Sequence, residues 1–252
     1  MVMKSIIFGS VRAIRAGLLI ALACVSLFPT RAWGLDAQKI FGRAKDSVVV
    51  VVGLDSYGKQ NALGSGFFIG DGKVVVTNFH VIKKASRIKI KAAGAGQLLE
   101  VTKVLAVNRK YDLALLLLPS AGDPLELAKD HPSVGQEVLA IGNPKGLEKT
   151  ISTGIVSGIR KKDKDFLVYQ ITAPISPGSS GGPILNNDGQ VLGLASFYMG
   201  GGQNLNFAVP SVYIDKLAGS RDVQGYRQPY RKKIEIKKDR SGVILLEEKD
   251  LK

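Results

Sequence analysis

The stretch Gly178-Ser179-Ser180-Gly181-Gly182-Pro183 sets one serine, Ser180, in a run of glycines. Glycine neighbours let the backbone turn sharply and let a substrate carbonyl come close to the serine hydroxyl. The backbone N–H groups of Gly178 and Ser180, with that of Ser179 as a third candidate, can then bind the oxygen that becomes negative during attack. The stretch therefore predicts a nucleophile loop. A flexible surface turn is the alternative unless a base and an orienting acid are also present.

Of the two histidines in the chain, His80 is the better candidate for the base. It follows Val74-Val-Val, an apolar β-branched run that predicts a buried strand. His131 lies in a polar, turn-rich stretch that is typical of a solvated loop. A histidine beside an apolar strand is more often structural than catalytic, so the catalytic interpretation depends on a third residue.

That third residue is Asp112, a single acid at the start of the uncharged apolar run Leu113–Leu118. A carboxylate there tends to be partly buried and needs a partner such as an imidazole N–H. Capping of a turn at the end of a strand is the alternative. Together the three features predict that Ser180 is the nucleophile, His80 its general base, and Asp112 the acid that orients the base.

The order of these three residues along the chain is the chymotrypsin-like order, which differs from that of subtilisin and the α/β-hydrolases. Several further motifs follow in sequence: Gly64-Ser-Gly-Phe-Phe-Ile-Gly70, Val76-Thr-Asn-Phe-His-Val81, Asp112-Leu-Ala-Leu-Leu116, Val138-Leu-Ala-Ile-Gly-Asn-Pro144, Gly154-Ile-Val-Ser-Gly158 and Asn206-Phe-Ala-Val-Pro210. Over residues 35–218 the chain resembles the HtrA/Deg family of trypsin-like serine proteases. The resemblance implies cleavage of unfolded or damaged exported proteins through an acyl-enzyme on Ser180, without a metal or organic cofactor.

The runs of apolar residues predict an all-β fold. Short runs separated by Gly, Pro, Asn and Asp are typical of a sandwich or barrel, and their number fits a chymotrypsin-like pair of six-stranded barrels. The strands expected are 47–52, 66–69, 74–77, 87–91, 98–106 and 113–118, then 138–141, 151–159, 166–172, 182–185, 191–197 and 205–209. Short helices are expected within 35–46 and after Pro210, where Ser211 is a candidate N-cap and Gly219 a candidate stop.

Three segments are expected along the chain: a secretory signal at 1–34, a protease domain at 35–219 with barrels at about 35–120 and 136–210, and a basic tail at 220–252. The signal has basic residues at its start, the apolar run Ala16–Phe28 and small residues at Ala32-Trp-Gly34. An uncleaved membrane anchor is the alternative. The only cysteine, Cys24, lies in this segment, so the mature protein would have no disulfide, which suits a bacterial periplasm.

The chain is strongly basic, with a net charge of +14, and +10 remains without the four basic residues of the first 34. Such a charge favours anionic partners such as lipid headgroups, cell-wall polymers, nucleic acid or acidic substrates. The tail carries a dense basic run at 227–240, which is a candidate for docking to an anionic membrane or cell-wall surface, and a possible hairpin around 239–242. A solvated or disordered end is the alternative. Nothing in the tail resembles the PDZ domain that usually follows an HtrA protease, although the resemblance still suggests a homotrimer.

The substrate pocket is expected to accept a small or medium apolar side chain before the cut. No acidic residue lies between Asp165 and Asp188, which disfavours a pocket for Lys or Arg. The candidate lining residues are Ile175, Ala195, Ser196 and Phe207. Two other functions compete with proteolysis on the same fold: a proteolytically weak, chaperone-like protein, and a module that binds anionic surfaces.

Overall fold

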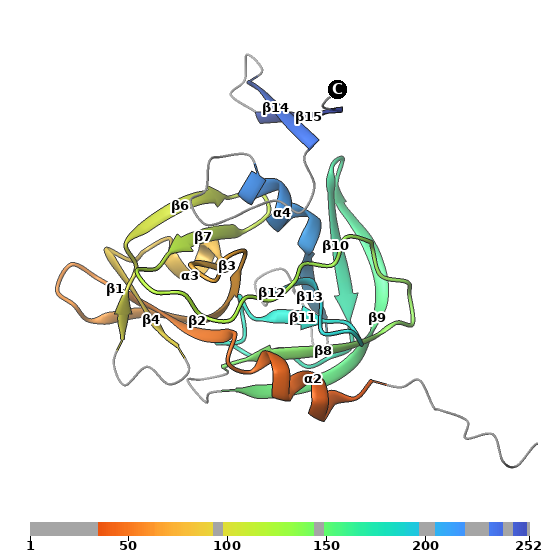
Figure 1. Cartoon of the computed structure of the whole chain (residues 1–252), viewed down its shortest axis with the longest axis horizontal. Coiled ribbons are helices and arrows are strands. Elements are labelled where there is room, and N and C mark those ends of the chain that lie inside the picture. The colour runs from red at the N-terminus through yellow and green to blue at the C-terminus, as the bar shows by residue number, and fades with distance from the viewer. Residues whose placement is uncertain are drawn as a thin grey trace, which may run out of the picture. The chain divides into compact units, whose positions relative to one another are not determined.

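The computed structural model describes residues 35–92, 98–143, 149–196 and 205–219 with their side chains, and the backbone of residues 232–238 and 244–250. The predicted signal segment at 1–34 lies outside these ranges. The all-β fold class is confirmed: two β units follow one another along the chain, accompanied by short helices (Figure 1).

The first β unit is a seven-stranded sheet in the order β5-β4-β1-β2-β3-β7-β6. Its strands are β1 (Val48–Leu54), β2 (Gln60–Ile69), β3 (Val74–Asn78), β4 (Arg87–Lys91), β5 (Leu99–Glu100), β6 (Lys103–Asn108) and β7 (Leu113–Leu117). The apolar strands β1 and β3 are buried on both faces, which explains why their sequences are continuous β-branched runs rather than alternating ones.

The expected strand 98–106 was wrong, because the chain forms two short strands there. β5 pairs with β4, whereas β6 pairs with β7. Between them the Val101 amide donates to Ile88 O at 3.0 Å and the Thr102 amide donates to Leu117 O at 2.9 Å. The chain therefore changes its pairing partner within two residues, and the two edge strands of the sheet are joined by this bend.

The second β unit is a closed barrel of six strands in the order β10-β13-β12-β11-β8-β9. Its strands are β8 (Glu137–Gly142), β9 (Thr150–Asp163), β10 (Phe166–Ile171), β11 (Pro183–Leu185), β12 (Val191–Ser196) and β13 (Asn206–Pro210). β9 pairs with β8 along its first residues and with β10 along its last. This long strand thereby closes the barrel.

One hydrophobic core joins the two units. It contains Phe67 and Leu113 from the first unit and Leu139 and Leu194 from the second, all of them fully buried. Separating the two units would expose these side chains to water. This is unfavourable, because burial of large apolar side chains is the main source of stability. The segments that meet between the units, including Asp112 and the nucleophile loop, are thus held by common packing.

In the described part of the chain, three helices accompany the strands. α2 (Ala37–Ala44) begins after Asp36, whose side chain accepts a hydrogen bond from the Lys39 amide. α3 (Phe79–Ile82) follows β3 directly. α4 (Ser211–Gly219) ends at Gly219 as expected, but Ser211 is not its N-cap. Ser211 already lies in the helix, and its buried hydroxyl donates to Ala128 O at 2.9 Å.

Near the C-terminal end, β14 (Lys232–Lys238) and β15 (Ile244–Asp250) form an antiparallel hairpin, with pairing from Lys232↔Asp250 to Lys238↔Ile244. The two paired strands flank the predicted turn at 239–242, which lies outside the described residues. Within the described ranges, the helices are too short or too polar to cross a membrane.

Tyr169 is expected to make the stability of the protein fall at alkaline pH. Its side chain is 1 % exposed, and burial raises the pKa of Tyr169 well above its ordinary value. Between pH 10 and that raised pKa the unfolded chain has lost the phenolic proton while the folded chain keeps it, so the free energy of unfolding falls as pH rises above about 10.

Denaturant unfolding of the wild type and Tyr169→Phe between pH 8 and 11 measures this effect. The difference between the two proteins should change by up to about 1.4 kcal/mol per pH unit above pH 10. Parallel profiles for the two proteins would show that Tyr169 does not resist ionisation.

Candidate active site

Strand pairing brings His80 and Asp112 together. β3 and β7 are antiparallel neighbours with Asn78 opposite Leu113, so the residues just beyond these strand ends meet. The backbone amide of His80 donates to Asp112 Oδ1 at 2.8 Å, and His80 Nδ1 lies 2.7 Å from Asp112 Oδ2. A carboxylate can only accept, so Nδ1 carries the proton and Nε2 is left as the basic nitrogen.

Asp112 has an unusual backbone conformation, with φ at +56°. A left-handed conformation costs a residue with a side chain about 1–2 kcal/mol, so the surrounding contacts must hold it. The Asp112 carbonyl accepts from Asn78 Nδ2 at 3.0 Å and from the Phe79 amide at 3.1 Å. The turn before β7 is therefore fixed against the start of α3, where His80 lies.

Ser180 lies in a loop of the second unit that is bonded to β2 of the first. The Ser180 carbonyl accepts from the Ser65 amide at 2.7 Å, and the Ser65 hydroxyl donates to Gly178 O at 2.7 Å. Gly178 and Gly181 have φ values of +98° and +92°, which glycine adopts without strain. The sequence thus needs glycine on both sides of the nucleophile candidate to form this loop.

Ser65 is the centre of a buried hydrogen-bond network that the sequence did not reveal. Its hydroxyl accepts from the Asn143 amide at 2.9 Å, while its carbonyl accepts from Thr77 Oγ1 at 2.7 Å. Asn143 Nδ2 also donates to Val49 O at 3.0 Å. Ser65 and Asn143 stand in the motifs around Gly64 and Gly142, which carried the family resemblance without indicating a role for either side chain.

One of the three predicted oxyanion donors is engaged elsewhere. The Ser179 amide donates to Ser176 O at 2.9 Å, so it is not available to a substrate oxygen in this structure. The Gly178 amide makes no hydrogen bond within the described part of the chain. Gly178 and Ser180 are therefore the proposed pair of donors, and a role for the Ser179 amide stays a prediction that requires this bond to open.

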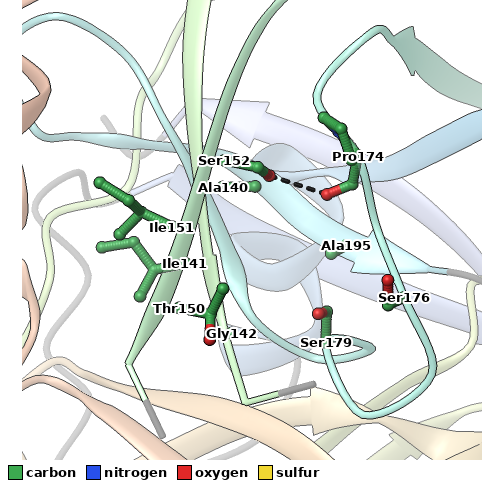
Figure 2. A pocket seen from close by; sticks show the side chains of 10 residues that line it. All are labelled: Ala140, Ile141, Gly142, Thr150, Ile151, Ser152, Pro174, Ser176, Ser179 and Ala195. Carbon is green, nitrogen blue, oxygen red and sulfur yellow. Dashed lines mark hydrogen bonds between the residues drawn. The ribbon is translucent and has the colours of Figure 1, made fainter. Parts of the chain in front are cut away.

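A pocket of about 230 Å³ borders the nucleophile loop (Figure 2). It lies between the loop and strands β8 and β9, and the Ser152 hydroxyl donates across it to Pro174 O at 2.7 Å. Its lining carries no charged side chain and consists of Ala140, Ile141, Gly142, Thr150, Ile151, Ser152, Pro174, Ser176, Ser179 and Ala195.

Of the four residues predicted to line the substrate pocket, Ala195 is the one that lines this pocket. Ile175 is buried in the core of the second unit, and Phe207 packs half-buried against the shared core. Ser196 is fully buried, with its hydroxyl 3.4 Å from Asp112 Oδ2. Ser196 therefore supports the carboxylate of Asp112, and the roles of Ile175, Ser196 and Phe207 in substrate binding stay predictions.

The described residues contain no cluster of three or more His, Cys, Asp or Glu side chains that could hold a metal ion. The groups that the structure brings together are the Asp112 carboxylate and the His80 imidazole, and the loop that carries Ser180 is bonded to the same β unit through Ser65. This set can move a proton and bind a developing negative charge, which are the two needs of acyl transfer.

Gly181→Ala is expected to be severely destabilising. A Cβ at Gly181 would lie 2.0 Å from Ser65 O and 2.6 Å from Thr77 Oγ1, and the residue has a positive φ. We expect the free energy of unfolding to fall by about 3–5 kcal/mol, because the clash is with backbone that cannot move without breaking the loop. Denaturant unfolding measures the loss.

Gly189→Ala is the matched control for this substitution. Gly189 also has a positive φ, of +83°, but a Cβ there has nothing within 4 Å. Gly189→Ala should lower the free energy of unfolding by only about 1–2 kcal/mol. Equal losses in the two variants would show that backbone conformation alone, rather than close approach to Ser65, sets the requirement for glycine.

Comparisons with known proteins agree with this geometry. Residues 64–194 match the trypsin-like peptidase domain. The chain is 35 % identical over 201 residues to a Chlamydia pneumoniae protein named "Probable periplasmic serine endoprotease DegP-like", covering 75 % of this chain and 38 % of that protein. It is 35 % identical over 185 residues to serine protease HTRA1 of Xenopus tropicalis, covering 68 % of this chain and 39 % of that protein.

Solved structures also match. The serine endoprotease from Yersinia pestis superposes with a TM-score of 0.64 at 28 % identity, covering 74 % of this chain and 66 % of that one. The Rv3671c protease from M. tuberculosis in its active form superposes with a TM-score of 0.65 at 25 % identity, covering 76 % and 86 %. The chain spans about two fifths of the length of the DegP-like and HTRA1 relatives. The chain therefore belongs to the family of trypsin-like peptidases, and the resemblance to the HtrA/DegP serine proteases is confirmed.

Proposed function

We propose that this chain is a serine endopeptidase in which Ser180 is the nucleophile, His80 the general base and Asp112 the orienting acid. The observation that carries the proposal is the double hydrogen bond of the Asp112 carboxylate to the backbone amide and Nδ1 of His80. A carboxylate that merely capped a turn would have no need to orient an imidazole ring. Ser65 supports the proposal further, because it ties the Ser180 loop to the unit that carries the other two residues.

The proposed reaction begins when Ser180 Oγ attacks the carbonyl carbon of a peptide and its proton passes to His80 Nε2. The carbonyl oxygen becomes negative and accepts hydrogen bonds from the Gly178 and Ser180 amides. His80 then gives its proton to the leaving amine, which breaks the C–N bond and leaves an acyl-enzyme. Water activated by His80 hydrolyses this ester and returns the proton to Ser180.

The proposed preference is for a small or medium apolar side chain before the cut. A cationic side chain needs a buried carboxylate as its partner, and residues 166–187 contain no acid. The pocket beside Ser179 and Ala195 is likewise uncharged. The pattern of cuts that wild type makes in a denatured protein, and that Ser180→Ala does not make, measures the preference; cuts mainly after Lys or Arg would contradict it.

The proposed substrates are unfolded or damaged exported proteins, and the proposed location is the periplasm or the secreted fraction. Two observations support this: the relatives from Chlamydia pneumoniae and Marinomonas are named as periplasmic, and the only cysteine lies in the predicted signal. An anchor at the inner membrane is the alternative.

The disulfide-bonded and the reduced, alkylated forms of one secreted protein make a matched pair of substrates. Wild type should cleave the reduced form at least ten times faster than the disulfide-bonded form, and Ser180→Ala should cleave neither. Equal rates on the two forms would contradict the preference for unfolded chains. Suppression of aggregation by both proteins without any cleavage would instead favour the chaperone-like alternative.

An anionic partner, such as a membrane or cell-wall surface, and a homotrimer also stay proposals. Support for the anionic partner comes from the charge of the chain and from Lys161, Lys162 and Lys164, which are exposed at the tip between β9 and β10. Sedimentation with vesicles of phosphatidylglycerol and of phosphatidylcholine tests the first proposal. Equal binding to both lipids, or binding that 0.5 M salt does not weaken, would contradict it.

A further inference from the structure

Tyr111, the residue that precedes Asp112, packs against two rings from outside its own β unit. Its ring is stacked on that of Tyr213 in α4, with centroids 4.2 Å apart and planes 24° apart. Phe166 at the start of β10 lies 5.0 Å from Tyr111, and 5.5 Å from Tyr213 in an edge-on arrangement. These three residues, Tyr111, Phe166 and Tyr213, form what we call the aromatic cluster.

Two members of the cluster are rigidly attached to the second unit. Phe166 and Tyr213 are almost fully buried. The Tyr213 hydroxyl accepts from the Leu167 amide at 2.8 Å and donates to Asp165 O at 3.2 Å. Both rings are therefore fixed at the start of β10, where they offer Tyr111 a rigid packing surface.

Tyr111 is also fixed on the side of its own turn. Its amide donates to Asn108 Oδ1 at 3.0 Å, at the end of β6. The neighbouring ion pair between Lys110 and Asp163, at 3.0 Å, spans the same gap between the units. Both of its side chains are largely exposed, so we expect this pair to contribute little. The ring contacts thus tie the turn to the second unit, beside the Ser196 hydroxyl that lies 3.4 Å from Asp112 Oδ2.

We propose that Tyr111 is a positioning residue for the reaction, a proposal that rests on the proposed function. The left-handed conformation of Asp112 is unfavourable on its own, and one peptide bond joins it to Tyr111. The aromatic cluster holds that peptide in place, so the Asp112 carboxylate keeps both hydrogen bonds to His80. Without the cluster the turn relaxes, and the bond to His80 Nδ1 is lost for part of the time.

The proposal gives α4 and the start of β10 a role in catalysis at a distance. These elements contribute no group to the chemistry, yet they set the orientation of a carboxylate in the other unit. The orienting acid is then fully effective only while the two units are docked.

The test compares Tyr111→Leu with Tyr111→Phe. Leucine removes the stacked ring but keeps an apolar side chain, whereas phenylalanine keeps the ring. With active sites counted by a fluorophosphonate label, Tyr111→Leu should lower kcat by about 10-fold and change KM by less than two-fold. Tyr213→Leu should act in the same way, and Tyr111→Phe should restore kcat to within two- to three-fold of wild type. Tyr57→Leu, at an exposed turn, is the surface control.

A second measurement separates positioning from a general loss of stability. The chain has two histidines, so His131→Gln leaves His80 as the only source of imidazole ¹⁵N signals. In the His131→Gln protein, the imidazole proton of His80 should be on Nδ1. Adding Tyr111→Leu should move the ¹⁵N chemical shifts of Nδ1 and Nε2 toward each other, because the tautomer with the proton on Nε2 becomes populated. Tyr111→Phe should leave them in place.

A kcat for Tyr111→Leu within two-fold of wild type would overturn the proposal. So would a lower kcat with unchanged ¹⁵N shifts, since the residue would then act on something other than the orientation of His80. The NMR measurement needs no turnover. If wild type neither cleaves nor takes the label, the proposed function fails, while the shifts still report whether Tyr111 positions Asp112.

Discussion

Ser180→Ala should lower kcat on an unfolded protein substrate by at least about 10⁴-fold, because it removes the oxygen that attacks the carbonyl. The fold should survive, since the contact of Ser180 that fixes the loop is its backbone carbonyl, which accepts from Ser65. We expect the free energy of unfolding to change by no more than about 1 kcal/mol. Initial rates of casein cleavage and denaturant unfolding measure the two quantities.

Ser179→Ala is the matched control in the same loop. The Ser179 side chain lines the pocket, so this variant should keep at least a tenth of the wild-type rate. If Ser179→Ala lost as much activity as Ser180→Ala, the assignment of the nucleophile would be wrong. Residual cleavage that is equal in wild type and Ser180→Ala would point to a contaminating protease.

Asp112→Asn should lower kcat by about 10⁴-fold with little change in KM. The asparagine amide presents N–H donors where Asp112 Oδ2 now accepts from His80 Nδ1. The imidazole would then put its proton on Nε2, so it could no longer take a proton from Ser180. Steady-state kinetics on a peptide substrate measure both constants.

Asp71→Asn is the control for this substitution. Asp71 is exposed in a turn and accepts from the Lys73 amide, a contact that an asparagine oxygen can also make. The Asp71→Asn variant should cleave the peptide substrate at the wild-type rate. A loss smaller than 10-fold for Asp112→Asn would mean that this carboxylate does not orient a catalytic base.

The positions of His80 and Asp112 could be predicted because each follows or precedes an apolar run. The residues 74–76 and 113–116 are fully buried in strands, and the pairing of these strands as β3 and β7 puts the two polar residues at one end. Continuous apolar runs identify strands that are covered on both faces. The short helix α3 was not predicted, because four residues are too few to show a helical period.

The contacts that join the two units could not be predicted. Ser65 and Asn143 are 78 residues apart, and each is a small polar residue in an otherwise apolar strand region. Their hydrogen bonds depend on how two separate β units pack, which no local pattern encodes. The aromatic cluster was missed for the same reason, since Tyr111, Phe166 and Tyr213 come from three distant segments.

The predicted lining residues lie in different surroundings for another reason. Ala195 and Ser196 are neighbours in β12, so their side chains point to opposite faces of the strand. A sequence cannot show which face borders a pocket and which faces Asp112. The predicted strand at 98–106 failed because its residues are apolar enough for one strand, while the chain must bend at Val101 and Thr102 to reach a second partner.

The most direct test of the catalytic triad is the site of reaction with a fluorophosphonate. Intact mass should show one adduct per chain, and peptide mapping should place it on Ser180. Ser180→Ala should take no label, and Asp112→Asn should be labelled far more slowly than wild type. A labelled residue other than Ser180, or a folded wild type that takes no label, would contradict the assignment of Ser180, His80 and Asp112 as a catalytic triad.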